Sequence, residues 1–327
     1  MSETRLTNAE IDLDVFNAYS VEPSIYQSKF FKSGSLVNNT EMSAMLSGQG
    51  ESFSTPFWKD TAGGTGDVPI EGADATVNAL TSGKQMFRKQ VRTKVWGSNN
   101  LVGVFSGSDP MKAGAGMVAN YWAQAFDQLA IKSIIGILED NVSNNSSDLI
   151  NDISAEAGAA AYFSDNAVID TQSLLSENGS NFTAILVHPK VKAYMRKLDL
   201  IDFVPISGQD RPLMVYMGME VIEDRNAPLT GGDYSTILMK AGSVQMGIST
   251  QGYIPSEFNR EPLDGFGIDQ LVTRRTFGLT VPGFASLEGG FAGLTPTDAE
   301  LILAAAWERV YNAENSPIVS LRHTLPA

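Results

Sequence analysis

The sequence predicts an α+β fold in which one long helix accompanies several groups of strands. Three observations carry this prediction. Residues 212–284 read as strands separated by turns, residues 109–140 read as one long helix, and residues 87–96 alternate as a strand after a glycine-rich segment. The 327 residues, 43% of them hydrophobic, are enough for a sizeable core.

The segment 212–284 contains almost no residue types suited to catalysis. A first strand, Leu213 to Tyr216, is followed by a turn at Met217-Gly218-Met219 and a second strand at Val221-Ile222. The chain then breaks at Asp224-Arg225-Asn226-Ala227-Pro228. Two further strands are predicted, at Ile237–Gly242 and at Asp269–Val281.

The long helix is predicted to run from Asp109 to about Asp140. Asp109 is a suitable N-cap, and Pro110 needs no hydrogen-bond partner at the first helical position. Roughly 30 residues give a length of ~45 Å. The apolar positions change face midway, from Val118, Trp122, Phe126 and Leu129 to Ile131, Ile134, Ile135 and Leu138. This switch predicts that the helix crosses two packing environments.

A two-stranded arm is predicted before this helix. The strand Phe87–Trp96 places Arg88, Arg92 and Lys94 on one face, and its other face is largely apolar, with Phe87, Val91 and Val95. The preceding segment carries Asp67, Glu71 and Asp74, and a turn near Ser82-Gly83 would fold this acidic strand onto the basic one. Because an isolated hairpin is only marginally stable in water, the arm needs a surface to lie on. This surface is either its own domain or a neighbouring subunit, and the sequence does not decide between the two.

Shorter elements complete the expectation. Helices are predicted at Asn8–Tyr19, Ala155–Ala161, Thr171–Glu177 and Lys190–Leu198, with an extended stretch at Val21–Phe31 and a strand at Thr183–Val187. A last helix is predicted to start at Thr295-Pro296-Thr297-Asp298 and to bury Ala299, Leu303, Trp307 and Val310. His323 is placed in a C-terminal tail.

The composition argues against several classes of function. A net charge of −14 disfavours general nucleic-acid binding. Solubility is the simplest explanation of this charge, which would also suit a container whose inner wall must not grip packed DNA. The absence of cysteine excludes disulfides and thiolate metal sites, and it fits assembly in a reducing cytoplasm. We expect no signal peptide at residues 1–10 and no membrane helix, because no apolar run approaches ~18 residues.

Candidate chemical motifs are weak. Residues 114–119 match a dinucleotide fingerprint, but the match lies inside the predicted long helix and follows no strand, so no cofactor is expected. The two histidines, His188 and His323, show no metal-ligand or triad spacing, and we expect no metal site. Two carboxylate clusters, 199/202 and 220/223/224, leave a carboxylate-based hydrolase as an alternative.

The order of these segments resembles the major capsid proteins of tailed bacteriophages, whose fold is shared with encapsulins. The resemblance rests most strongly on Tyr216-Met217-Gly218-Met219-Glu220-Val221, on Asn226-Ala227-Pro228 and on the strand from Arg274 to Phe284. It implies an N-terminal arm at 1–46, an extended β-hairpin loop at 47–98, a peripheral domain with the spine helix at 99–150 and 251–327, and an axial α/β domain at 151–250.

The resemblance also implies a function without catalysis. The subunit would assemble with itself as hexamers and pentamers into an icosahedral head around double-stranded DNA, with scaffolding, portal and decoration proteins as further partners. The protein would assemble in the host cytoplasm and reside in the virion. An encapsulin-type compartment for cargo enzymes is the alternative. We expect the contacts between subunits to involve Phe57, Trp58, Glu71, Asp74, Arg88, Arg92 and Lys94.

Overall fold

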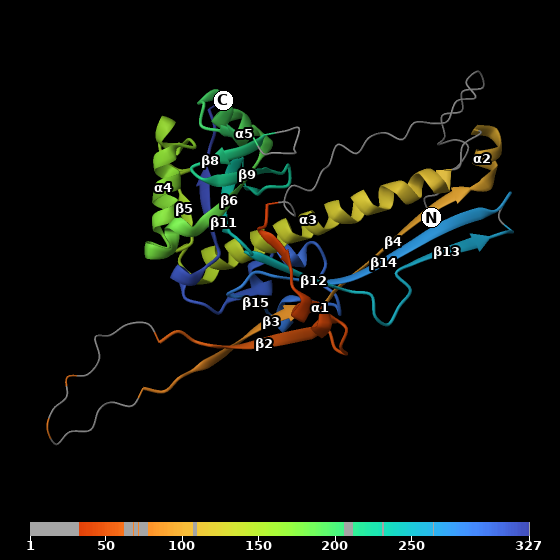
Figure 1. Ribbon diagram of the computed structural model, residues 1–327, viewed down its shortest axis with the longest axis horizontal. Helices are drawn as coiled ribbons and strands as arrows, with labels where there is room; N and C mark the ends of the chain where they lie inside the picture. The colour runs from red at the N-terminus through yellow and green to blue at the C-terminus, as the bar shows by residue number, and fades with distance from the viewer. Residues whose placement is uncertain are drawn as a thin grey trace.

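The computed structural model describes residues 33–61, 68, 71, 78–106, 110–205, 212–230, 232–263 and 265–326. Two larger sheets flank one long helix. A two-stranded hairpin projects from the body on the side opposite the N-terminal end of that helix (Figure 1). This arrangement confirms the predicted α+β class. The helix and strand predicted at 8–31 lie outside the described residues.

The first sheet has eight strands and holds much of the buried core. Its order is β5 (Ile150–Asp152), β17 (Ile318–His323), β11 (Asp233–Lys240), β6 (Phe182–Val187), β9 (Met219–Glu223), β8 (Leu213–Tyr216) and β7 (Asp202–Val204), with β10 (Leu229–Thr230) paired to β11. Residues 184–187 of β6 are fully buried. Met217 and Gly218 have φ values of 49° and 81°, which form the predicted tight turn between β8 and β9.

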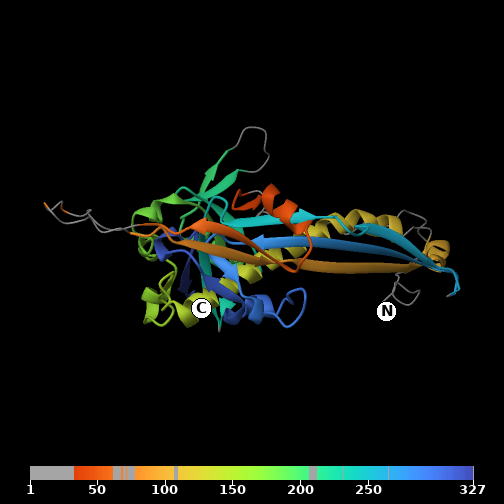
Figure 2. The same ribbon diagram turned by 90° about the horizontal axis from the view of Figure 1, so that it is seen from below.

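The second sheet is long and narrow. Its 13-residue central strand β14 (Ile268–Thr280) pairs on one side with β12 (Val244–Ser249) and β13 (Ser256–Glu261), and on the other side with β4 (Gln90–Asn99). Strand β1 (Leu36–Asn38) extends the sheet beside β12, and helix α1 (Thr40–Leu46) packs over β12 and β14. Figure 2 shows these strands running side by side along the length of the molecule. Helix α2 (Asn100–Ser106) follows β4 at the far end.

The predicted long helix is α3 (Pro110–Asn144), with 35 residues. Its first half lies on β14, where the Trp122 indole N–H donates to the Thr273 hydroxyl at 3.2 Å and the Phe126 and Phe277 rings meet at 4.8 Å. Its second half is enclosed by the C-terminal segment. The predicted change of packing environment is therefore confirmed. Asp109, the expected cap, lies outside the described residues.

Some of the helices that connect strands of the first sheet agree with the prediction and others do not. Helix α5 (Pro189–Lys197) agrees with the expectation, and His188 caps it by accepting from the Lys190 N–H at 3.2 Å. Helix α4 (Asp165–Ser173) starts earlier than predicted, because Ser164 supplies the N-cap by accepting from the Ala167 N–H. Residues 158–161 form only a short 3₁₀ turn, and a second 3₁₀ turn occupies 176–181.

The predicted C-terminal helix is wrong. The chain forms 3₁₀ turns at 300–302 and 304–306 and then strand β16 (Trp307–Arg309), which pairs with β15 (Phe284–Ser286). The expected start does form, since the Glu300 carboxylate accepts from the Thr297 N–H at 2.8 Å. The carbonyl oxygen of Leu301, however, accepts from the Trp307 indole N–H at 2.9 Å. A tertiary contact thus takes the acceptor that a continuing helix would use.

The last strand also corrects the sequence analysis. His323 lies at the end of β17, inside the first sheet between β5 and β11, and not in a free tail. Residues 318–323, expected in the peripheral domain, pair with strands that lie within the expected axial domain, 151–250. Strand β12, at 244–249, lies within that expected range but belongs to the second sheet with β14. The remaining domain limits stay predictions.

Candidate inter-subunit surface

The hairpin consists of β2 (Ser52–Trp58) and β3 (Ser82–Arg88), paired from Ser52↔Arg88 to Trp58↔Ser82. This corrects the expected turn at Ser82-Gly83, which lies within β3. It also corrects the expected pairing of the acidic segment with Phe87–Trp96, because that stretch is divided between β3 and β4. The chain is continuous through Lys89, so the hairpin and β4 extend in opposite directions from one point (Figure 1).

The hairpin is fixed to the body at its root by one buried amide. The Gln85 side chain is 7% exposed, and its NH₂ group lies at 2.7 Å from the Thr280 hydroxyl and at 2.9–3.0 Å from the carbonyl oxygens of Val281 and Phe284. Buried acceptors without a donor are costly, so this amide links β3 to the end of β14 and to β15. The role of Gln85 was not predicted from the sequence. The available signal was that Gln85 is a polar residue two positions before Phe87, on the face of the strand that is otherwise largely apolar.

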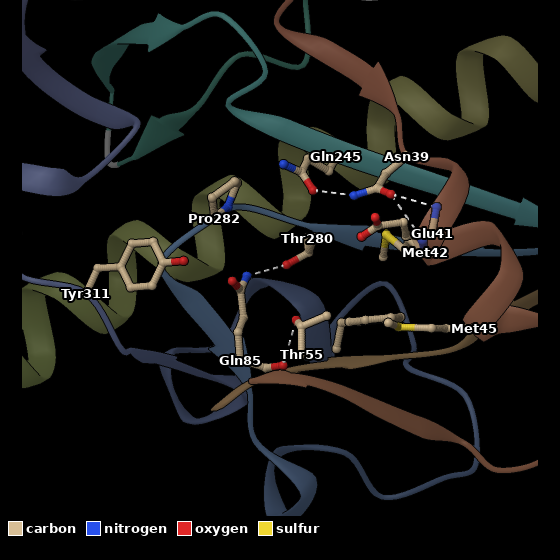
Figure 3. Close-up of a pocket in the computed structure, with 11 residues that line it drawn as sticks. Asn39, Glu41, Met42, Met45, Thr55, Gln85, Gln245, Thr280, Pro282 and Tyr311 are labelled. Atoms are coloured by element: carbon tan, nitrogen blue, oxygen red, sulfur yellow. Dashed lines mark hydrogen bonds between the residues drawn. The ribbon is translucent and has the colours of Figure 1, made fainter. Parts of the chain in front are cut away.

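A small apolar cluster supports the same root. The rings of Phe53 and Phe87 stack at 5.7 Å, and Met42 and Leu46 of α1 complete the cluster. Beside it lies a cavity of about 160 Å³ between α1, the hairpin and the second sheet (Figure 3). Its wall combines apolar side chains with polar ones, namely Asn39, Glu41, Met42, Met45, Thr55, Gln85, Phe87, Gln245, Thr280, Pro282 and Tyr311.

The two aromatic residues predicted to contact a neighbour differ in their surroundings. Phe57 lies against its own chain, with its ring over Gly83 and 4.7 Å from the Tyr311 ring. Trp58, the last residue of β2, is 74% exposed, and Glu71, between β2 and β3 in the sequence, is also exposed. Asp74 lies outside the described residues. The structure therefore leaves Trp58 and Glu71 available for a partner.

The three predicted basic residues make contacts within their own chain. Arg88 is 3.1 Å from the Glu51 carboxylate and donates to the Gly293 carbonyl at 2.7 Å. Lys94 lies over the Tyr121 ring of α3 at 5.7 Å from its centre. Of the expected acidic partners, Asp67 and Asp74 lie outside the described residues.

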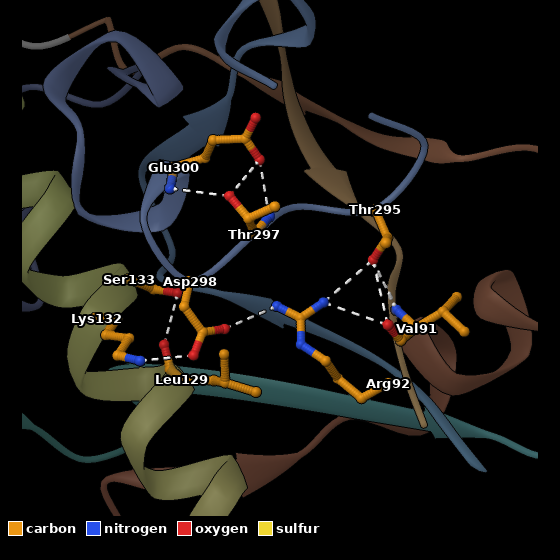
Figure 4. A network of polar contacts seen from close by, with 9 residues as sticks. All are labelled: Val91, Arg92, Leu129, Lys132, Ser133, Thr295, Thr297, Asp298 and Glu300. Atoms are coloured by element: carbon orange, nitrogen blue, oxygen red, sulfur yellow. Dashed lines mark hydrogen bonds and ion pairs between the residues drawn. The ribbon is translucent and has the colours of Figure 1, made fainter. Parts of the chain in front are cut away.

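Arg92 belongs to a network that joins three elements (Figure 4). Asp298 receives hydrogen bonds from Arg92 at 3.2 Å and from Lys132 of α3 at 2.7 Å. Burial alone would raise the pKa of Asp298, but the two cations outweigh it and hold this pKa below its ordinary value. The network fastens β4, α3 and the C-terminal segment to one another.

An amphipathic strand ordinarily buries its apolar face, but strand β4 turns its basic face toward the body of the protein. Its basic face lies on α3, where Lys94 lies over the Tyr121 ring, and Arg275 of the neighbouring strand β14 lies over the Trp122 ring. Its apolar face is uncovered, with Val91 and Val95 exposed at 43% and 48%.

The alternative chemical sites have structural explanations. Glu223 pairs with Lys192 at 2.6 Å, and Asp224 accepts from the Asn226 N–H in a turn. Burial raises the pKa of Glu220, which lies alongside them on β9. Residues 114–119 lie inside α3, as expected, so they do not open a phosphate loop.

Within the part of the chain that the structure describes, no group of three histidine, aspartate or glutamate side chains is arranged to hold a metal ion. None of the helices that the structure describes is long and apolar enough to cross a membrane.

Comparison with known proteins gives a consistent result over the whole chain. No protein-family model matches. The major capsid protein of Bacillus phage SPP1 is 29% identical over 336 residues, and the match covers all of both chains. Among solved structures, the capsid of Ralstonia phage GP4 matches with a TM-score of 0.63 at 13% identity, covering 100% of this chain and 99% of the other. The Cyanophage Pam1 capsid matches with a TM-score of 0.57 at 12% identity, covering 98% of each.

The two solved capsids share the fold of this chain, and at 12–13% identity the likeness concerns the fold alone. The full-length sequence match adds a relative that is itself a major capsid protein. Over its whole length the chain is therefore similar to a phage major capsid protein, and it has the fold of solved phage capsids.

Proposed function

We propose that copies of this chain assemble as hexamers and pentamers into an icosahedral head that encloses double-stranded DNA. The observation that carries the proposal is the match of the entire chain, without a missing segment, to a major capsid protein. The division into N-terminal arm, extended loop, peripheral domain and axial domain is part of the same proposal.

The hairpin supports the assembly role. It has two strands only, and beyond its root it extends away from both large sheets (Figures 1 and 2). Trp58 and Leu80 near its outer part are 74% and 70% exposed. Burial of large apolar side chains is worth roughly 1.5–3 kcal/mol each, so a neighbouring subunit is the natural place for these two.

The charge of the chain supports enclosure of DNA without sequence-specific binding. A net charge of −14 makes tight contact with phosphates unfavourable, and the basic residues 88, 92 and 94 of the expected contact surface already have partners in the same chain. Packed DNA would then remain free to enter and leave.

Expression of the chain followed by electron microscopy tests the proposal. Closed shells of uniform size are expected, and a stable 35.1 kDa monomer at high concentration would contradict it. The contents of shells made in the presence of the neighbouring genes separate a viral head, which holds DNA, from an encapsulin, which holds an enzyme.

The hairpin can be tested separately by hydrogen exchange. Amides of β2 and β3 beyond the root are expected to exchange rapidly in the unassembled subunit and slowly in the shell. Full protection of these amides in the isolated subunit would show that the hairpin does not need a neighbour.

A further inference from the structure

Strand β4 forms one edge of the second sheet, and most of this edge has no neighbouring strand in the part of the chain that the structure describes. Strand β14 pairs with β4 on one side, and no described strand pairs with it on the other. The edge runs along the side of the molecule in Figure 2. Open edges carry unpaired N–H and C=O groups, and folded proteins ordinarily cover or blunt them.

The direction of the main-chain groups follows from one contact at the start of β4. The Thr295 hydroxyl accepts from the Val91 N–H at 2.9 Å and lies 3.5 Å from the Val91 carbonyl oxygen. The groups of Val91 therefore point away from β14. Since direction alternates along an antiparallel strand, Thr93, Val95 and Gly97 point to the same open side.

Thr295 covers only the first of these four positions. None of the main-chain groups of Thr93, Val95 and Gly97 has a hydrogen-bond partner among the described residues on the open side. Thr93 is exposed, and Val95 is 48% exposed. This stretch has no proline or inward-pointing charge on its apolar face that would prevent another strand from pairing.

We propose that the β4 edge at 93–97 receives an extended strand from a second copy of this chain. This inference rests on the proposed function, because it requires that copies meet in a shell. The hairpin of the same chain is unable to reach this edge, since it leaves Lys89 in the opposite direction. The added strand would give affinity through main-chain hydrogen bonds and selectivity through alternate side chains.

The surroundings of the edge favour a second copy. On the apolar face, Val95 lies opposite Val272 of β14, so alternate residues of the added strand would complete an apolar row with Val91. Arg92 and Lys94 on the other face are engaged within the chain, so the apolar row and the main-chain groups are what the edge offers. In a shell built from one protein, a second copy is the partner that meets such an edge.

Residue-level hydrogen exchange tests the proposal on the full chain, before and after assembly. In the unassembled subunit, the amides of Thr93, Val95 and Gly97 are expected to exchange rapidly, whereas those of Lys94 and Trp96 are protected by β14. In shells, the first three are expected to slow by at least about 100-fold, while the other two serve as the internal control.

Proline variants test the same edge by assembly. T93P removes an N–H that points away from β14, so the sheet keeps its own hydrogen bonds and the subunit is expected to fold. Shell yield is expected to fall at least about tenfold in T93P and to be unchanged in T93A, which keeps the N–H. Circular dichroism and thermal unfolding of the unassembled T93P subunit establish that it is folded.

The possible outcomes are distinct. Rapid exchange at 93, 95 and 97 in closed shells, or normal shell formation by folded T93P, would overturn the edge proposal and leave the proposed function intact. Protection of these amides already in the isolated subunit would show that the chain covers its own edge and would also overturn it. Failure of the parent chain to form any oligomer would contradict the proposed function and this inference together.

Discussion

The indole N–H of Trp307 donates to the carbonyl oxygen of Leu301, six residues earlier, at 2.9 Å. Both groups press against Gly136 in the middle of α3. A Cβ atom at this glycine would lie 2.1 Å from the Leu301 oxygen and 2.4 Å from the Trp307 nitrogen. The close approach of the C-terminal segment to α3 therefore depends on the missing side chain.

Gly136→Ala is expected to lower the free energy of unfolding by about 2 kcal/mol or more. The gain of up to about 1 kcal/mol in helix propensity is outweighed, because the Leu301 backbone would have to move. Chemical denaturation of the unassembled subunit measures the effect. Gly289→Ala is the matched control, since nothing lies within 4 Å of its added atom. Equal stability of the two variants would contradict the packing argument.

The same contact explains part of what the sequence did not reveal. The stretch from Thr295 to Asp298 was predicted to start a helix, but only 3₁₀ turns follow it, because the Trp307 indole takes the Leu301 carbonyl oxygen through a tertiary contact. Similarly, the sequence showed that polar and apolar residues alternate along β4, but it did not show which of the two faces is buried. The aromatic residues that receive Lys94 and Arg275 lie on another element, and no local pattern reports them.

Local signals succeeded where local chemistry decides the structure. The turn at Met217-Gly218, the helix after His188 and the length of α3 all follow from short-range preferences. The hairpin was expected from the alternation of 87–96 and a turn at Ser82-Gly83, but its pairing was wrong, because the true partner strand of β3 is the aromatic β2 and not the acidic segment. The contact role of Trp58 stays a prediction, and the anchoring role of Gln85 was not predicted.

Gln85→Leu is expected to destabilise the subunit by about 2–3 kcal/mol. The substitution keeps the approximate volume but leaves the Thr280, Val281 and Phe284 acceptors without their donor. Thermal unfolding and the hydrogen exchange of β3 both report the change. Thr55→Val is the control at the same root, because its hydroxyl makes only a long 3.4 Å contact. A loss in T55V as large as in Q85L would assign the effect to general packing.

Asp298→Asn is expected to remove a small stabilisation that depends on pH. The pKa of Asp298 is lowered in the folded state, so its contribution is present above the ordinary pKa of about 3.9 and is lost as the pH falls through the lower folded value. The side chain is 55% exposed, so the magnitude is ~1 kcal/mol or less. D298N and the parent should differ at pH 7 and converge near pH 2.

A double-mutant cycle isolates the contact with Lys132 of α3. Lys132→Met and D298N together should destabilise less than the sum of the two single changes, because each single change already removes the 2.7 Å ion pair. Additive effects at pH 7 would mean that the pair contributes nothing measurable.

His323 is expected to make the subunit less stable as the pH falls below about 6.5. The ring is fully buried, with Nε2 at 3.0 Å from the Thr236 hydroxyl and Nδ1 at 3.0 Å from the Thr324 carbonyl oxygen. Burial lowers its pKa, although the Thr324 carbonyl and Asp233 oppose the shift. The unfolded chain therefore binds the proton first, and stability falls between the unfolded and the folded pKa by at most about 1.4 kcal/mol per pH unit.

His323→Gln tests this assignment, because glutamine does not titrate in this range. Its unfolding free energy is expected to be lower than that of the parent at pH 7.5 and to change less between pH 6.5 and pH 5. His188→Gln should keep most of the slope, since burial lowers the pKa of His188 too, but this ring is half-buried at the start of α5. If H323Q retained the full slope and H188Q lost it, the acid sensitivity would lie at the helix cap and not in the core of the first sheet.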